Sequence, residues 1–367
     1  MVMRLFILIL FVFINCHVKA NAMPVEIIVS PGGIKAWVIR DRSVPLIAIR
    51  FIFRGSGAVS DPIGKFGRAN MASALLDEGA GTLGSQDFQR EVQDRSILLS
   101  FNVGKDILGG TVKVLNRYRK KGLELTRLAI GAPRFDQAAI RRIRAQILTS
   151  LKARSSQPDY IAGREWARIM YGDHVYSQPV IGTQESLANI NRLDLQSFVK
   201  ENLTLDRLII SIVGDIDLEE AKLLLDEMFA NLPKKGRQTI VKKAQVPSEG
   251  KVYVFTKTVP QSVVLFGHQG VARKNPNFFT AYIINHILGG GSFTSRLYNS
   301  VREQRGLAYS VSTYLSVRPN APLIIGQLST SNDKVAETLR VVRSEWQKMA
   351  RYGVKKKTLA NSKKFIN

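Results

Sequence analysis

The sequence predicts an α+β protein built from two related halves, the second of which is incomplete. Three observations support this fold class. The 367 residues have a globular composition, 45% hydrophobic and 22% charged. Short apolar runs that are typical of strands alternate with amphipathic segments that are typical of helices. The order of these elements recurs after a polar linker, which favours a duplicated plan.

Residues 1–22 have the pattern of a signal peptide. A short basic start precedes the apolar run 5–14, which is too short to span a bilayer comfortably. Residues 20–22 read Ala-Asn-Ala, an A-x-A cleavage site, so we expect a mature chain beginning at Met23 in the periplasm of a bacterium. A large residue precedes Cys16, the only cysteine, which argues against a lipoprotein. An uncleaved membrane anchor is the alternative.

The first half is predicted to comprise residues 23–232. Its strands are apolar runs bounded by turn signals such as Pro31-Gly32-Gly33, and its helices follow capping residues. Asp217 and Glu220 have the spacing of a capping box. The predicted strands are 25–29, 34–39, 46–53 and 208–213, and the predicted helices are 66–76, one that begins after Asp136, and one that begins after Asp217.

A basic linker, 233–250, precedes the second half, 251–367. There we expect strands at 251–255 and 262–267, followed by a helix that begins at Asn275-Pro276 and ends at a run of three glycines. Residues 250–367 number 118, against 209 for residues 24–232, so the second half lacks about 91 residues relative to the first. An unfinished α/β unit exposes a sheet edge, so we expect the isolated chain to aggregate or to bind a partner through this half.

The chain is strongly basic, with 53 Lys and Arg against 29 Asp and Glu, a formal net charge of +24. The excess is spread along the chain, with short runs at 117–121 and 355–357, and a solvated basic surface is the favoured interpretation. Binding to an anionic surface is the alternative. Because no basic stripe is interleaved with aromatic residues, the pattern argues against a nucleic-acid-binding module.

Spacing alone defines no complete active site. Of the four histidines, His17 leaves with the signal peptide, and no two of His174, His268 and His286 have metal-ligand spacing on one helix. No nucleophile elbow or phosphate-binding loop is present.

One stretch is more specific. Residues 291–310 read GSFTSRLYNSVREQRGLAYS after two further glycines. The Gly-Gly-Gly, Ser-Arg-Leu and Arg-Glu-x-Arg-Gly-Leu-Ala-Tyr blocks together resemble the C-terminal signature of the M16 zinc metallopeptidases, the pitrilysin and mitochondrial-processing-peptidase family. The resemblance extends from about Val25 to the end of the chain. It implies two α/β-roll halves, of the kind that form a clam-shell chamber around a peptide.

The catalytic motif of that family is H-x-x-E-H on the first long helix, where two histidines one turn apart bind zinc and the glutamate acts as general base. In the matching stretch, Asn70 and Ala74 replace the histidines and Ser73 replaces the glutamate. The position of the third ligand falls near Thr149. None of these four side chains is a good zinc ligand, so the resemblance implies a chain that binds no zinc and is inactive alone.

Two neighbouring acids, Asp77 and Glu78, are out of register with that motif, and we interpret them as surface or helix-end residues.

Arg302 and Tyr309, seven residues apart, match the family's second-half pair, which reaches the substrate backbone and the transition-state oxygen across the chamber. The plainer alternative is that Arg302 pairs with Glu303 or another helix neighbour and that Tyr309 packs in the core. The resemblance thus implies a secreted, non-catalytic subunit that pairs with a zinc-bearing homologue as a heterodimer and supplies these two residues for peptide hydrolysis. A degenerate homologue that binds peptides or assists assembly, without a peptidase partner, is the alternative.

Overall fold

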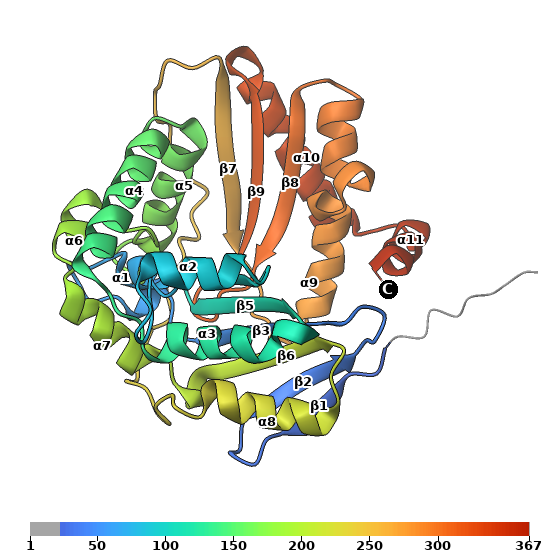
Figure 1. Ribbon diagram of the computed structural model, residues 1–367. Coiled ribbons are helices and arrows are strands. Elements are labelled where there is room, and N and C mark those ends of the chain that lie inside the picture. The colour runs from blue at the N-terminus through green and yellow to red at the C-terminus, as the bar shows by residue number, and fades with distance from the viewer. Residues whose placement is uncertain (1–22, 367) are drawn as a thin grey trace, which may run out of the picture.

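The computed structural model describes residues 23–366. The predicted signal peptide, with Cys16 and the cleavage site, lies outside the described residues. The chain forms two lobes, each built on its own sheet with helices packed against it (Figure 1). The prediction of a mixed α+β fold is confirmed. No helix among residues 23–366 is both long and apolar enough to cross a bilayer.

The first lobe contains a six-stranded sheet of order β1-β2-β6-β3-β5-β4. Its strands are β1 Glu26–Val29, β2 Lys35–Arg40, β3 Leu46–Arg54, β4 Leu98–Val103, β5 Ile107–Leu115 and β6 Leu208–Gly214. Only β2 and β6 run parallel among the neighbouring pairs, and the others are antiparallel. All four strands predicted in this half are present within a residue or so of their expected bounds.

Eleven α-helices lie within the described residues. They are α1 Arg68–Ser73, α2 Ser85–Gln93, α3 Arg119–Gly131, α4 Gln137–Ser155, α5 Pro158–Tyr171, α6 Gln184–Ala188, α7 Arg192–Asn202, α8 Leu218–Phe229, α9 Phe278–Asn285, α10 Val335–Tyr352 and α11 Lys356–Ile366. At the start of α8 the backbone N–H of Asp217 donates to Glu220 Oε2 at 3.5 Å, as the capping-box spacing predicts. Asp136 directly precedes α4, but its carboxylate accepts from Arg134 Nε at 2.7 Å instead of capping the helix.

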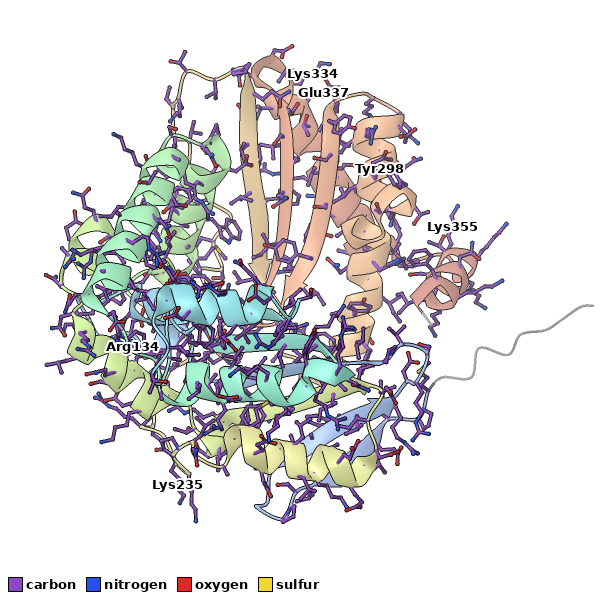
Figure 2. All side chains as sticks on the ribbon, viewed as in Figure 1. Arg134, Lys235, Tyr298, Lys334, Glu337 and Lys355 are labelled. Carbon is purple, nitrogen blue, oxygen red and sulfur yellow. The ribbon has the colours of Figure 1, made fainter. Side chains whose placement is uncertain are left out.

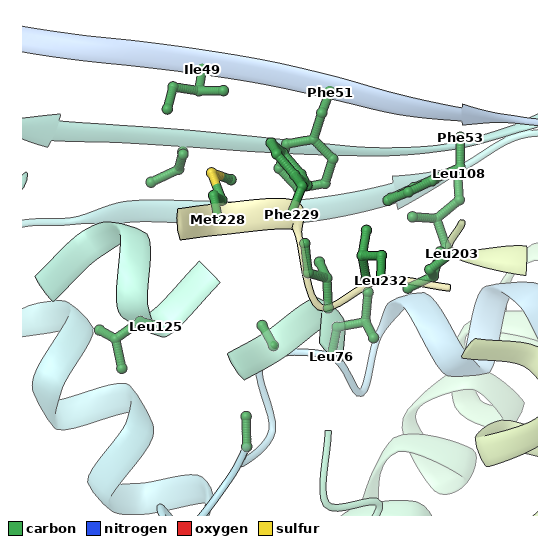
Figure 3. Packing of buried hydrophobic residues seen from close by; sticks show 14 of the residues in the cluster. Ile49, Phe51, Phe53, Leu76, Leu108, Leu125, Leu203, Met228, Phe229 and Leu232 are labelled. Atoms are coloured by element: carbon green, nitrogen blue, oxygen red, sulfur yellow. The ribbon is translucent and has the colours of Figure 1, made fainter. Parts of the chain in front are cut away.

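The core of the first lobe lies between one face of the sheet and its helices. Phe51 of β3 is fully buried, and its ring centroid lies 5.4 Å from that of Phe229 at the end of α8. Figure 3 shows these rings together with Met228 and Leu232 beneath the strands. Alternate residues of β3 point into this core, which is the alternation expected of a strand covered on one face only.

The second lobe contains a three-stranded antiparallel sheet of order β7-β9-β8. Its strands are β7 Gln261–Gln269, β8 Ala308–Ser316 and β9 Leu323–Ser331. The pairing repeats that of β3, β5 and β4 in the first sheet. In both sheets a phenylalanine faces a glycine on the neighbouring strand: Phe51 of β3 lies opposite Gly110 of β5, and Phe266 of β7 lies opposite Gly326 of β9. The structure therefore supports the duplicated plan with a register that sequence comparison could not supply.

The predicted strand at 251–255 is absent. The backbone there joins no sheet, and the side chains of Val252, Tyr253, Val254 and Phe255 are exposed. A strand requires a neighbour for its backbone hydrogen bonds, and β7 pairs only with β9 among the described residues. The other second-half strand, predicted at 262–267, is present as β7. The helix that follows is also present, but it ends in a π-helical turn, His286–Gly290.

The segment 230–260 has almost no regular structure but is fastened to both lobes. On the first lobe, His174 Nε2 lies 2.8 Å from the carbonyl oxygen of Lys242, which belongs to this segment. Two residues later, the N–H of Ala244 donates to the carbonyl of Asn320, between β8 and β9, at 2.8 Å. The predicted linker is therefore a strap held on both sides.

The two lobes also contact each other directly. Arg318, in the turn between β8 and β9, has Nη1 3.5 Å from Asp106 Oδ2 in the turn between β4 and β5. Tyr176 donates from its hydroxyl to the other oxygen of Asp106 at 2.5 Å. Apolar side chains surround these groups, with Tyr171 and Tyr176 packed against Leu323 and Ile325 of β9. The contact combines a buried apolar cluster with one shared carboxylate.

Candidate functional site

The positions of the degenerate zinc motif lie on α1 and its end. At the start of this helix the carboxylate of Asp61 accepts from the N–H groups of Gly67 and Ala69, both at 2.8 Å. The helix ends at Ser73, so it is shorter than the predicted 66–76. Asn70 is half-buried, Ser73 is buried, and Ala74 is exposed just beyond the last helical residue. An amide, a hydroxyl and a methyl group thus replace a zinc-binding pair and its base.

Thr149 lies in the fourth turn of α4 and is exposed. Within residues 23–366 no group of three or more histidine, cysteine or acidic side chains could hold a metal ion. The described part of the chain therefore offers no alternative to the lost motif.

The two acids next to the motif have structural partners. Arg142 of α4 binds Glu78 in a forked pair, with Nη1–Oε1 at 3.0 Å and Nη2–Oε2 at 2.5 Å. Ser85 donates to the same carboxylate, and these hydrogen bonds from Arg142 and Ser85 lower the pKa of Glu78. A carboxylate held ionised in this way is a poor candidate for a general base near neutral pH. Burial raises the pKa of Asp77, whose backbone carbonyl accepts from Gln89.

Arg302 and Tyr309 lie together in the structure. Arg302 belongs to a π-helical segment, Tyr298–Glu303, and Tyr309 is the second residue of β8. The guanidinium carbon lies 4.5 Å from the centroid of the Tyr309 ring. Tyr309 is 80% exposed, so it is not a core residue. Its hydroxyl is therefore available to a ligand.

A second tyrosine completes this cluster, and sequence reasoning missed it. The ring centroid of Tyr298 lies 5.0 Å from the Arg302 guanidinium carbon, so two aromatic rings contact one cation. Tyr298 itself is buried, in the helical segment beside β8 (Figure 2). Residues four apart share a helix face, so the spacing of Tyr298 and Arg302 was an available signal. We call Tyr298, Arg302 and Tyr309 the Tyr-Arg-Tyr cluster.

The guanidinium of this cluster keeps its hydrogen-bonding capacity. Among residues 23–366 no group accepts a hydrogen bond from it, and no carboxylate, including that of Glu303, lies within 4 Å. The structure therefore lacks the alternative ion pair with Glu303, although Arg302 does contact a helix neighbour, Tyr298. Ring faces hold the cation through its π surface and leave its N–H edge for a carbonyl or carboxylate.

The glycine run allows the π-helical turn that precedes the cluster, His286–Gly290, to approach β8 closely. A Cβ atom on Gly289 would lie 2.6 Å from Thr313 Oγ1, and one on Gly291 would lie 2.7 Å from the carbonyl oxygen of His286. Larger residues would push the turn away from β8. Two π-helical segments follow each other in this region, and such segments are frequent at functional sites.

The remaining histidines are engaged within the fold. His174 Nδ1 accepts from the N–H of Tyr176 at 3.1 Å, and its other nitrogen meets Lys242. His286 Nδ1 lies 2.7 Å from Ser362 Oγ of α11. His268 Nδ1 lies 2.7 Å from the carbonyl oxygen of Gln269.

The chain is similar in sequence to a described protein family and to several bacterial proteins. Residues 189–365 match the family model described as the peptidase M16 inactive domain. A relative from Helicobacter pylori named "Non-peptidase homolog YmxG" is 25% identical over 326 residues, 88% of this chain and 74% of that protein. The "Uncharacterized zinc protease YmxG" of Bacillus subtilis is 26% identical over 68% of this chain and 60% of its own length. Several mycobacterial relatives are matched over about half of their length.

Solved structures share the fold. A peptidase M16 inactive domain from Pseudomonas fluorescens superposes with a TM-score of 0.87 at 24% identity, over 94% of this chain and 83% of that one. A chain of complex III2 from Candida albicans superposes with a TM-score of 0.73 at 15% identity, over 94% of this chain and 80% of that one. Fold and degenerate motif together define a non-catalytic relative of zinc metallopeptidases. By these similarities the chain is M16-like: residues 189–365 match the inactive domain of the M16 peptidases, and the H-x-x-E-H motif is lacking.

Proposed function

We propose that this chain is an exported, non-catalytic subunit that pairs with a zinc-bearing M16 homologue and supplies Arg302 and Tyr309 for peptide hydrolysis. The observation that carries the proposal is the Tyr-Arg-Tyr cluster. It has an exposed phenol and a guanidinium whose N–H donors meet no acceptor among the described residues. Zinc and its general base would belong to the partner, so this chain's share is binding and orientation.

The chemistry asked of the two residues is specific. In peptide hydrolysis the scissile carbonyl oxygen gains negative charge as water attacks, and a positioned hydroxyl such as that of Tyr309 stabilises that charge. Arg302 donates to a neighbouring peptide carbonyl or carboxylate. Removing one preorganised donor of this kind costs about 10²–10³ in rate.

The test is reconstitution with the partner. Co-purification from the native host should first yield a stoichiometric chain with an intact H-x-x-E-H motif. Tyr309→Phe should then lower turnover of the reconstituted pair far more than it lowers complex formation. Arg302→Ala should also raise KM. Tyr352→Phe is the matched control because Tyr352 is equally exposed, at 80%, on α10. If both variants assemble and cleave like wild type, the cluster is structural.

We further propose that the chain alone binds no zinc. The motif positions supply no ligand set, and among residues 23–366 neither His174 nor His286 belongs to a group of three or more potential metal ligands. Elemental analysis of the purified chain should find no stoichiometric zinc. One tightly held zinc that disappears on mutation of either histidine would contradict this.

Export is proposed on the sequence of residues 1–22 alone. N-terminal sequencing of the mature protein should begin at Met23, and a lipid-modified Cys16 would overturn the assignment and place the protein on a membrane.

A second candidate function is peptide binding or assembly without a peptidase partner. The match to a domain described as inactive, and to a relative named a non-peptidase homologue, favours it. Absence of any zinc-bearing homologue among co-purified proteins, with retained peptide binding, would select this candidate.

A further inference from the structure

The first sheet has a face that no helix covers. Its helices pack on the face that carries Phe51, so the residues alternating with it point the other way. On that open face Ile27, Val29, Trp37 and Val213 are exposed, although they are large and apolar. A patch of exposed apolar residues on a sheet is uncommon unless it binds something.

Strand pairing joins these residues into continuous rows across the sheet. One row runs from Ile27 to Trp37, Ser211, Arg50, Thr111 and Ser100, from β1 through to β4. The adjacent row contains Ile39, Val213, Ala48, Lys113 and Leu98. Neighbouring strands are about 4.8 Å apart. Within each row a cation therefore lies one or two strands from an apolar side chain, which is within the reach of one extended peptide.

The open face carries cations and no acids. Lys35, Arg50, Arg54 and Lys113 alternate with the inward-facing residues of their strands and are exposed. None of the four forms an ion pair within the described residues, whereas twenty ion pairs occur elsewhere in residues 23–366. None of the outward-facing strand positions that accompany them is aspartate or glutamate. Unpaired cations beside apolar side chains are complementary to a ligand that is both anionic and apolar.

We propose that this open face is a docking surface for acidic, apolar segments of polypeptide. Apolar side chains of such a segment would pack on Trp37, Ile27 and Val213, and its carboxylates would pair with Arg50 and Lys113. The proposal rests on the proposed function for its choice of a polypeptide over another anionic, apolar partner. It deepens that function by naming the class of peptide that the subunit would select.

Trp37 provides a direct reporter. The chain has three tryptophans, so replacing Trp166 and Trp346 with phenylalanine leaves Trp37 as the only one. A short peptide that alternates glutamate and leucine should change its fluorescence saturably, and the same peptide with lysine in place of glutamate should not. Raising the salt concentration should weaken binding, because exposed charges are screened.

Substitutions then locate the surface. Arg50→Gln and Lys113→Gln should each weaken binding of the acidic peptide by up to about fivefold, the upper end of the range for exposed ion pairs. Trp37→Ala should weaken binding about tenfold or more, as expected for an aromatic side chain that the bound peptide would bury. Lys120→Gln and Arg141→Gln are the matched controls. These two cations are exposed on α3 and α4, away from the open face, and should have no effect.

Several outcomes would overturn the proposal. Equal binding of the lysine peptide, or equal effects of the control and test variants, would show a general charge effect. Binding of Trp37 to vesicles of anionic phospholipid, but not to the peptide, would assign the face to a membrane. This assay needs no partner and leaves the Tyr-Arg-Tyr cluster intact. Its result is therefore independent of whether Arg302 and Tyr309 serve hydrolysis.

Discussion

Gly110→Ala should destabilise the first lobe through a single steric conflict. A Cβ atom at position 110 would lie 2.2 Å from Cζ of Phe51 on the neighbouring strand. Phe51 cannot move aside easily, because its ring is fully buried. The centroids of Phe53, Phe101 and Phe229 lie 5.9, 6.3 and 5.4 Å away. Either a strand must shift or the ring must leave its preferred rotamer.

The sign of the effect depends on two opposing quantities. Replacing glycine with alanine stabilises a compatible site by about 0.4–1 kcal/mol, because the unfolded chain loses freedom. Overpacking a tightly filled core costs about 1–3 kcal/mol. Because the ring at this site is enclosed by three others, we expect the overpacking cost to prevail and the free energy of unfolding to fall by about 1–2 kcal/mol.

The second lobe contains the matched control. A Cβ atom at Gly326 would also lie 2.2 Å from the ring of the facing Phe266. That ring is only half-buried, against Trp346 at 6.0 Å, so it can turn toward solvent. Gly326→Ala should therefore change stability much less.

Urea unfolding followed by circular dichroism measures both variants, and Phe51→Leu supplies the cross-check. In combination with Gly110→Ala it should cost less than the sum of the two single changes, by about 0.5–3 kcal/mol. Equal midpoints for the two alanine variants, or additive effects in the double variant, would refute the steric reasoning.

Three further outcomes are expected. Burial raises the pKa of Asp61 from 3.8 to about 7. The folded chain therefore binds more protons than the unfolded chain between about pH 4 and 7, so the free energy of unfolding should fall as pH rises through this window. Asp61→Asn should remove that slope in urea titrations. Burial, with repulsion from Arg318, lowers the pKa of Lys105 to about 7. Above pH 7 the unfolded chain therefore binds more protons than the folded chain, so the free energy of unfolding should rise toward pH 10. Lys105→Met should flatten this rise. Tyr298→Leu should raise KM of the reconstituted pair about two- to thirtyfold, the range of one cation–π contact to Arg302, whereas Tyr298→Phe should restore it.

Four of the six strands in the first lobe were predictable because their apolar runs are rich in β-branched residues and bounded by turn residues, whereas β4 and β5 were not predicted. The run at 251–255 has the same composition but forms no strand, because composition does not supply a partner strand. Helix α1 was overestimated for a related reason, since the apolar run continues through Leu75 and Leu76 after the helix ends at Ser73.

The site was predictable in part. The resemblance supplied Arg302 and Tyr309, and the structure brings them within 4.5 Å. The sequence could not show that Arg302 forms no ion pair, because Glu303 is its neighbour in the chain. The open face of the first sheet was equally hidden. Arg50, Trp37 and Lys113 lie far apart in the sequence, and only strand order and register place them on one surface.

The strap between the lobes has a mechanical consequence. A free chain of its predicted length, 233–250, would let its ends separate by a root-mean-square distance of about 25 Å. Attachment of Lys242 to His174, and of Ala244 to the turn beside Arg318, shortens that tether to two residues where it crosses. These two attachments therefore restrict separation of the lobes far more than a free linker would. A ligand that forced the lobes apart would first have to break one of the two hydrogen bonds, so opening should be an all-or-none step with a threshold.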